Sequence, residues 1–211
     1  MNWVFDGPAD ALAAIMLAHG AGAAMDSASM NAITAALAGV GFRVARFEFG
    51  YMAARREGLR KPPPKAELLK DEFRDAIAQL KDVRPLIIGG KSMGGRVASM
   101  VADEFSESSD VVGLLCLGYP FHPPAKPQQL RTVHLVTLTT PTLICQGTRD
   151  PFGVREEVEG YDLSPAIELL WLEDGDHDLK PRKKISGYSH SDHLNAMAER
   201  ARDWGRSLIA A

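Results

Sequence analysis

Short apolar runs alternate along this chain with longer segments whose apolar residues recur at helical spacing. The runs predict strands at residues 3–5, 15–17, 42–49, 86–88, 111–117, 141–146 and 167–172. Most of these strands are apolar at every position, which is typical of parallel strands that are buried on both faces. Residues 3–5 are instead expected to form a short edge strand that ends at the turn beginning with Asp6.

Helical spacing predicts helices at residues 27–37, 66–80 and 129–138, from residue 93, and from about residue 191. The apolar stripe of the helix at 66–80 is formed by Leu68, Leu69, Phe73, Ile77 and Leu80. Residues 50–64 contain three consecutive prolines and several charges, so we expect them outside the core. Strands that alternate with helices predict a doubly wound, mostly parallel α/β sheet, which we place in one domain spanning residues 1–211.

Composition narrows the class of protein without indicating a macromolecular partner. The chain has 211 residues, 45% of them hydrophobic and 24% charged, which is ordinary for a soluble globular protein. Its formal charge of −3 gives no electrostatic reason to expect a nucleic acid or a membrane as partner. Residues 11–18 are too few to span a bilayer and the N-terminus lacks a secretion-signal pattern, so a cytoplasmic location is expected. Cys116 and Cys145 lie in apolar runs and are expected to be buried free thiols.

The strand at 86–88 gives way abruptly to a helix, and the corner between them carries Gly90-Lys91-Ser92-Met93-Gly94. This is the G-x-S-x-G pattern in the strand–turn–helix context of a nucleophile elbow. A serine on such a strained turn exposes its hydroxyl, and the flanking glycines allow the helix to approach the strand closely. The pattern alone leaves open a simpler role for Ser92, in which its side chain only caps the helix.

Two further polar residues are expected at the carboxyl ends of strands, where open α/β sheets bind their ligands. Asp150 follows the strand at 141–146, and His177 follows the strand at 167–172. With Ser92 they give the chain order Ser…Asp…His, which is the order of the α/β-hydrolase triad. We therefore expect Ser92 as the nucleophile, His177 as general base and acid, and Asp150 as the carboxylate that orients the imidazole. Alternatively, Asp150 is a plain turn residue, or the acidic loop around His177 holds a metal ion; a single histidine is a weak metal signal, and we expect no metal there.

The oxyanion hole is expected from two backbone N–H groups, those of Met93 and of Ala21 in the small-residue loop that begins at His19. His19 itself is expected to shape this loop, because it precedes the serine in the chain. The alternative bases are His122, His190 and His193. The first of these breaks the chain order, and the other two are expected to face solvent near the final helix.

Few residues separate Gly118 from Pro141, which leaves little room for a large cap domain. A shallow, open site for a small-molecule acyl substrate is therefore expected. The candidate walls of its substrate pocket are Tyr51, Met52, Tyr119, Phe121 and Phe152.

Several longer stretches carry a family resemblance, namely L-A-H-G-A-G-A, R-F-E-F-G-Y-M-A-A-R-R, G-G-K-S-M-G-G-R, G-L-L-C-L-G-Y-P-F-H-P-P, Q-G-T-R-D and D-G-D-H, which fall between about residues 16 and 180. The chain resembles the small lidless α/β-hydrolases, which include bacterial dienelactone-hydrolase-like proteins, a testis-expressed protein and a regulatory subunit of the histone-acetyltransferase NSL complex. The resemblance implies the α/β-hydrolase fold, triad positions for Ser92, Asp150 and His177, and hydrolysis of an ester or related acyl bond. Dienelactone hydrolases themselves look like cysteine enzymes, so their particular substrate is not implied.

These observations lead to the hypothesis of a serine hydrolase that forms an acyl-enzyme on Ser92 and needs no cofactor. The alternative is a non-catalytic protein-binding module on a hydrolase fold, which the relatives in regulatory complexes motivate and the intact set of triad residues argues against. Acyl transfer or perhydrolysis on the same triad is a third option.

Overall fold

The computed structural model describes residues 1–59, 61–80, 82–83, 85–107 and 111–210. Within these residues seven strands form one sheet in the order β1-β3-β2-β4-β5-β6-β7. They are β1 (Trp3–Asp6), β2 (Ala14–Ala18), β3 (Arg43–Phe47), β4 (Leu86–Lys91), β5 (Gly113–Leu117), β6 (Thr142–Gly147) and β7 (Ile167–Leu172). Every pairing in the sheet is parallel except that of β1 with β3 at one edge. The predicted mostly parallel sheet and its short edge strand are confirmed.

The register of the sheet brings the loops that follow several strands to one edge. Ala18 at the end of β2 is paired with Gly90 near the end of β4. At the end of β6, Gly147 is paired with Leu172, the last residue of β7. The chain therefore leaves β2, β4, β6 and β7 on the same side, as the placement of the candidate residues at strand ends requires.

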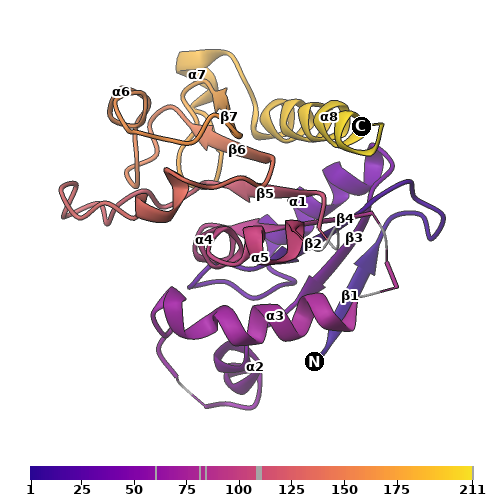
Figure 1. Ribbon diagram of the computed structural model, residues 1–211. Helices are drawn as coiled ribbons and strands as arrows, with labels where there is room; N and C mark the ends of the chain where they lie inside the picture. Colours follow the sequence, from indigo (N-terminus) through magenta and orange to yellow (C-terminus); the bar gives the residue numbers. More distant parts are fainter. Residues whose placement is uncertain (60, 81, 84, 108–110, 211) are drawn as a thin grey trace.

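Helices cover both faces of the sheet (Figure 1). One face is covered by α1 (Ala28–Gly39) and α8 (His190–Ile209), and the other by α2 (Gly50–Arg56), η1 (Ala66–Leu69), α3 (Lys70–Gln79), α4 (Met93–Ser99) and α5 (Ala102–Ser106). The remaining short elements are η2 (Val133–Leu135), α6 (Arg155–Val158) and α7 (Lys183–Ser186). Each face has its own apolar cluster, and α8 contributes Leu194, Met197, Ala201 and Trp204 to the second, as predicted. In the described part of the chain, no helix has the length and apolar character that a membrane crossing demands.

Three local predictions need correction. Residues 50–64 were expected outside the core, and residues 56–59 and 61–63 are indeed exposed, but α2 at the start of this segment buries Tyr51 and Met52. The helix expected at 129–138 is reduced to the short turn η2, because buried side chains such as Leu135 anchor an otherwise irregular segment. Leu68 was expected on the buried stripe, but it is 71% exposed, since the chain enters α3 through the tighter turn of η1 and the stripe starts one residue later.

Candidate active site

Ser92 lies at the corner between β4 and α4, with a φ of 53° and a ψ of −117°. A positive φ is uncommon for a residue with a side chain, and it marks a strained turn that the surrounding structure must hold. The turn fits because Gly90 and Gly94 lack side chains: a Cβ at either position would lie 2.5 Å from the carbonyl oxygen of Ala18. The Ser92 side chain does not cap α4, so the simpler role left open by the sequence is excluded.

The three polar side chains expected at strand ends meet at this corner. His177 Nε2 lies 2.8 Å from Ser92 Oγ, and His177 Nδ1 lies 2.8 Å from Asp150 Oδ2. Asp150 is completely buried, and its Oδ1 also accepts a hydrogen bond from the Phe152 N–H. A buried carboxylate that accepts from Nδ1 leaves Nε2 available to take the serine proton. The geometry is therefore a continuous hydrogen-bonded chain from hydroxyl to imidazole to carboxylate.

Two backbone N–H groups beside Ser92 are available for an incoming ligand. Among the backbone hydrogen bonds that the described residues form in turns, loops and helix caps, none is donated by the N–H of Met93 or of Ala21. Both residues line the same hollow as Ser92. Free N–H groups beside a nucleophile are the donors that an oxyanion hole requires.

The loop that carries Ala21 is held in place by two buried rings. His19 Nδ1 donates to the Gly20 carbonyl over 2.7 Å, and its Nε2 accepts from the Phe49 N–H over 3.2 Å. Burial lowers the pKa of His19, which favours this neutral form. The Tyr51 hydroxyl donates to the Ala21 carbonyl over 3.2 Å, and burial raises the pKa of Tyr51 to about 12. His19 thus has the loop-shaping place that was expected from the sequence.

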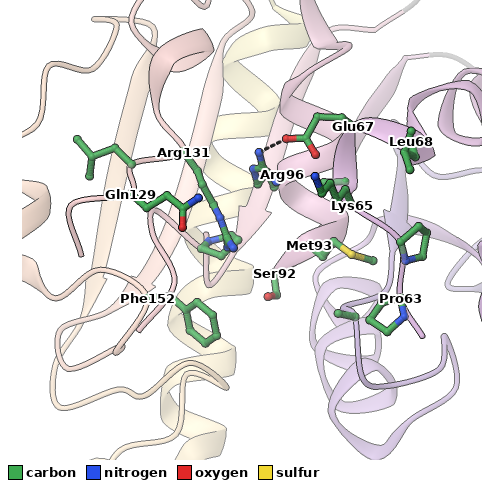
Figure 2. Close-up of a pocket in the computed structure, with 15 residues that line it drawn as sticks. Pro63, Lys65, Glu67, Leu68, Ser92, Met93, Arg96, Gln129, Arg131 and Phe152 are labelled. Atoms are coloured by element: carbon green, nitrogen blue, oxygen red, sulfur yellow. Dashed lines mark hydrogen bonds and ion pairs between the residues drawn. The ribbon is translucent and has the colours of Figure 1, made fainter. Parts of the chain in front are cut away.

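Ser92 lies between a large open hollow of about 1030 Å³ and a smaller one of about 290 Å³. Ala21 and Phe152 also line both, and Figure 2 shows the large hollow around Ser92. The Phe152 ring packs against the imidazole of His177, with ring centroids 4.2 Å apart. Phe152, one of the predicted pocket walls, is thus placed to contact a ligand at Ser92.

The other predicted walls lie elsewhere. Tyr119 and Phe121 are completely buried in the apolar cluster on the face of the sheet that α4 covers, so their prediction as pocket walls is wrong. Tyr51 and Met52 are buried too and line neither hollow at Ser92. Alternating apolar residues in a loop do not reveal which ones turn inward, because that depends on the helices packed above them.

With this geometry established, residues 11–206 match the family described as the alpha/beta hydrolase domain. The chain belongs to this family. Its α/β-hydrolase architecture is similar to that of Est1E from Butyrivibrio proteoclasticus with ferulic acid bound, at 14% identity and a TM-score of 0.70 over 100% of this chain and 96% of that one. A serine hydrolase without a lid from Xanthomonas campestris matches at 18% identity and a TM-score of 0.63, over 96% of this chain and 88% of that one.

Dienelactone hydrolase from Anabaena variabilis is similar at 20% identity and a TM-score of 0.70, over 97% of this chain and 90% of the solved chain. At these identities the likenesses show the fold alone. They confirm the predicted α/β-hydrolase fold without a large cap domain, and the predicted resemblance to the lidless and dienelactone-type members.

Two of the three alternative bases in this α/β-hydrolase, His122 and His193, have other partners. His122 Nε2 lies 3.1 Å from Glu157 Oε2. His193 is buried and its Nδ1 donates to the Leu179 carbonyl over 3.0 Å, so the expectation that it faces solvent is wrong. His190 is half-buried at the start of α8. Of the candidate histidines, His177 is the one hydrogen-bonded to Ser92.

A second serine–histidine pair lies at the C-terminal end of α4. Ser99 Oγ is 2.8 Å from His134 Nε2, but the Ser99 hydroxyl also lies 2.8 Å from the Arg96 carbonyl, to which it donates. Burial lowers the pKa of His134 to about 4. Among the described residues no carboxylate hydrogen-bonds the His134 ring, so this pair lacks the third member that the Ser92 site has.

The acidic loop around His177 is held by basic side chains. Asp174 accepts a hydrogen bond from the Arg182 N–H over 2.6 Å and pairs with the Arg182 guanidinium, which lowers the pKa of Asp174 to about 2. Asp178 Oδ1 lies 3.3 Å from Lys91 Nζ. In the described part of the chain no group of three or more metal-ligating side chains converges.

Two residues at the site were missed by sequence reasoning. Lys91 precedes the nucleophile, is 6% exposed, and lines the small hollow beside His177. Gln146 is completely buried at the end of β6, and its Nε2 donates to Asp150 Oδ2 over 3.0 Å. Each is a polar residue at the end of an otherwise apolar strand, and this pattern could have revealed them in the sequence. A polar side chain buried at such a place needs a hydrogen-bond partner.

Proposed function

We propose that this protein is a serine hydrolase that cleaves carboxylic esters or related acyl bonds through an acyl-enzyme on Ser92. The observation that carries the proposal is the hydrogen-bonded chain from Ser92 Oγ through His177 to the buried carboxylate of Asp150, with both heavy-atom distances at 2.8 Å. This arrangement activates a hydroxyl that is otherwise a poor nucleophile.

The roles follow from the geometry. Ser92 Oγ attacks the acyl carbonyl while His177 Nε2 takes its proton, and the N–H groups of Met93 and Ala21 donate to the developing oxyanion. His177 then protonates the departing alcohol, which leaves the acyl group on Ser92. Water, deprotonated by the same imidazole, attacks the acyl-enzyme and releases the acid and the free serine. Asp150 stabilises the imidazolium that forms in each step.

The site fits a small-molecule ester. The segment between β5 and β6 contains only the short turn η2, so no cap covers Ser92 from that side. The similar protein Est1E binds ferulic acid, a small aromatic acid. An open site of this kind suits a small molecule whose acyl group is accessible.

The test is hydrolysis of p-nitrophenyl esters of increasing acyl length by the wild type, Ser92→Ala and Ser99→Ala. We expect turnover by the wild type, a loss of at least about a thousandfold in kcat for Ser92→Ala, and near-normal activity for folded Ser99→Ala. Loss of activity in Ser99→Ala together with full activity in Ser92→Ala would move the nucleophile to the second pair.

A wild type that hydrolyses no ester and reacts with no fluorophosphonate probe would favour the alternative, a binding module on a hydrolase fold. A product assay with competing alcohol or peroxide acceptors distinguishes hydrolysis from acyl transfer or perhydrolysis.

A further inference from the structure

The large hollow at Ser92 carries an excess of positive charge. Its lining includes Arg96, Arg131 and Lys65, with Glu67 as the single acidic residue among the lining side chains. Figure 2 shows Arg131 extending from its loop toward the centre of the hollow, on the side of Ser92 where Arg96 also lies. An excess of one charge beside a nucleophile favours substrates of the opposite charge.

The two arginines differ in their partners. Arg96 is paired with Glu67 over 2.5 Å. Arg131 is half-buried and forms no ion pair with any described residue, although its backbone is hydrogen-bonded to Phe121. Burial lowers the pKa of Arg131, and the neighbouring charge of Arg96 lowers it further. A half-buried guanidinium close to a like charge is stabilised when an anion binds to it.

Most of the other residues that line the hollow are apolar. Leu68 and Leu130 are 71% and 44% exposed, and both line the hollow together with Met93 and Phe152. Exposed leucines beside an open hollow offer contact area to an apolar chain. A ligand that fits both parts has an apolar body and carries negative charge.

We propose that Arg131, supported by Arg96, binds a carboxylate of the substrate, so that the substrates of this site are esters that carry a free carboxylate on an apolar body. The proposal rests on the proposed hydrolase function. A guanidinium fork binds a carboxylate with two parallel hydrogen bonds. Because Glu67 already pairs with Arg96, Arg131 is the guanidinium in the lining that a substrate carboxylate can bind without displacing another carboxylate.

The test compares kcat/KM for two matched ester pairs in the wild type and Arg131→Met. In the first pair, mono-p-nitrophenyl glutarate carries the anion on the acyl side and p-nitrophenyl valerate is its neutral counterpart. In the second, 4-carboxyphenyl valerate carries it on the leaving group and 4-carbamoylphenyl valerate is neutral. We expect Arg131→Met to lower kcat/KM for the anionic member of one pair by about tenfold or more, and for the neutral members by less than about twofold.

Two further variants serve as controls. Arg131→Lys retains the charge and should keep much of the preference for the anionic ester. Arg206→Met removes an exposed arginine on α8, which does not line the large hollow, and should leave the preference unchanged. The preference should also fall as sodium chloride is raised, because salt screens the attraction.

Equal ratios of anionic to neutral turnover in the wild type and Arg131→Met, for both pairs, would overturn the carboxylate subsite and leave the hydrolase proposal intact. A parallel fall for neutral and anionic esters would assign Arg131 a structural role and would overturn it as well. If no ester is hydrolysed, the hydrolase proposal fails, and calorimetric binding of mono-p-nitrophenyl glutarate to Ser92→Ala and to Ser92→Ala/Arg131→Met still decides the subsite. Equal affinities of the two variants for this ester would reject the carboxylate subsite.

Discussion

Gln146 Nε2 donates a hydrogen bond to Asp150 Oδ2 over 3.0 Å, and the same carboxylate oxygen accepts from His177. The amide oxygen of Gln146 accepts from the Tyr119 N–H over 2.7 Å, so this side chain links β6 to the loop after β5. The carboxylate that orients His177 is therefore itself oriented by a buried amide. Such a residue positions the triad without touching the reacting atoms.

We expect Gln146→Met to lower kcat for a neutral ester by about tenfold while KM stays nearly constant. Methionine fills a similar volume but leaves the Tyr119 N–H and one lone pair of Asp150 without their partner, which should lower the free energy of unfolding by about 2–4 kcal/mol. Steady-state kinetics and urea denaturation measure the two effects. Gln128→Met, at an exposed position, is the matched control. An unchanged kcat in the folded variant would remove Gln146 from the positioning of the triad.

Gly94→Ala should disturb both the elbow and the loop that supplies Ala21. The new Cβ would lie 2.5 Å from the Ala18 carbonyl oxygen and 2.7 Å from that of His19, and neither backbone group can move without shifting its strand or loop. We expect a loss of about 1–3 kcal/mol in unfolding free energy together with reduced kcat. Gly39→Ala, where no atom lies within 4 Å of the added Cβ, should be neutral or stabilising by up to about 1 kcal/mol. Similar effects of the two substitutions would contradict the close approach seen at Gly94.

The pairing of Asp174 with Arg182 predicts how stability depends on acid. The pKa of Asp174 falls from its ordinary value of 3.8 to about 2, so the unfolded chain binds a proton more readily than the folded one. The stabilisation is therefore fully present above about pH 4 and is lost as the pH falls toward 2. Denaturant unfolding at pH 6, 4 and 3 should show a steeper loss for the wild type than for Asp174→Asn. Parallel losses in the two proteins would show that the pair is not coupled to folding.

Lys91 predicts a second window, at alkaline pH, in which stability depends on pH. Burial lowers the pKa of Lys91 below its ordinary value of 10.5, even though Asp178 opposes the shift. Between the lowered pKa and 10.5 the unfolded chain holds the proton that the folded chain has lost, so stability rises with pH in this window. The difference in unfolding free energy between the wild type and Lys91→Met should therefore increase in favour of the wild type from pH 8 to 10. A constant or falling difference would contradict a lysine whose charge is disfavoured by the fold.

The sequence was sufficient for the sheet and for the chain order of the triad. In a run such as the one beginning at Leu86, consecutive residues are apolar, so both faces of the strand are expected to be buried. This pattern is typical of a central parallel strand. The polar residues Asp150 and His177 stand out because they follow such runs directly, at the edge where the strand ends of a parallel sheet gather. Local pattern and overall topology agree at these positions.

The pocket walls could not be predicted in the same way. Tyr119 and Phe121 follow β5 in a loop, and they are buried in an apolar cluster built from segments distant in the chain, which no local periodicity encodes. Arg131 lies in a segment where the expected helix does not form, and Leu68 lies in one whose helical phase differs from the expected phase. Their places at the hollow therefore appeared only with the tertiary structure. Buried partners such as Gln146 have a sequence signal, but their target is set by strands that are distant in the chain.

The most direct test of the account is the site of covalent labelling by a fluorophosphonate probe, located by mass spectrometry after tryptic digestion. The account predicts one stoichiometric adduct on the peptide that contains Ser92, lost in Ser92→Ala and strongly slowed in His177→Ala. An adduct on Ser99, or no adduct on a folded wild type under conditions that label a known serine esterase, would contradict it.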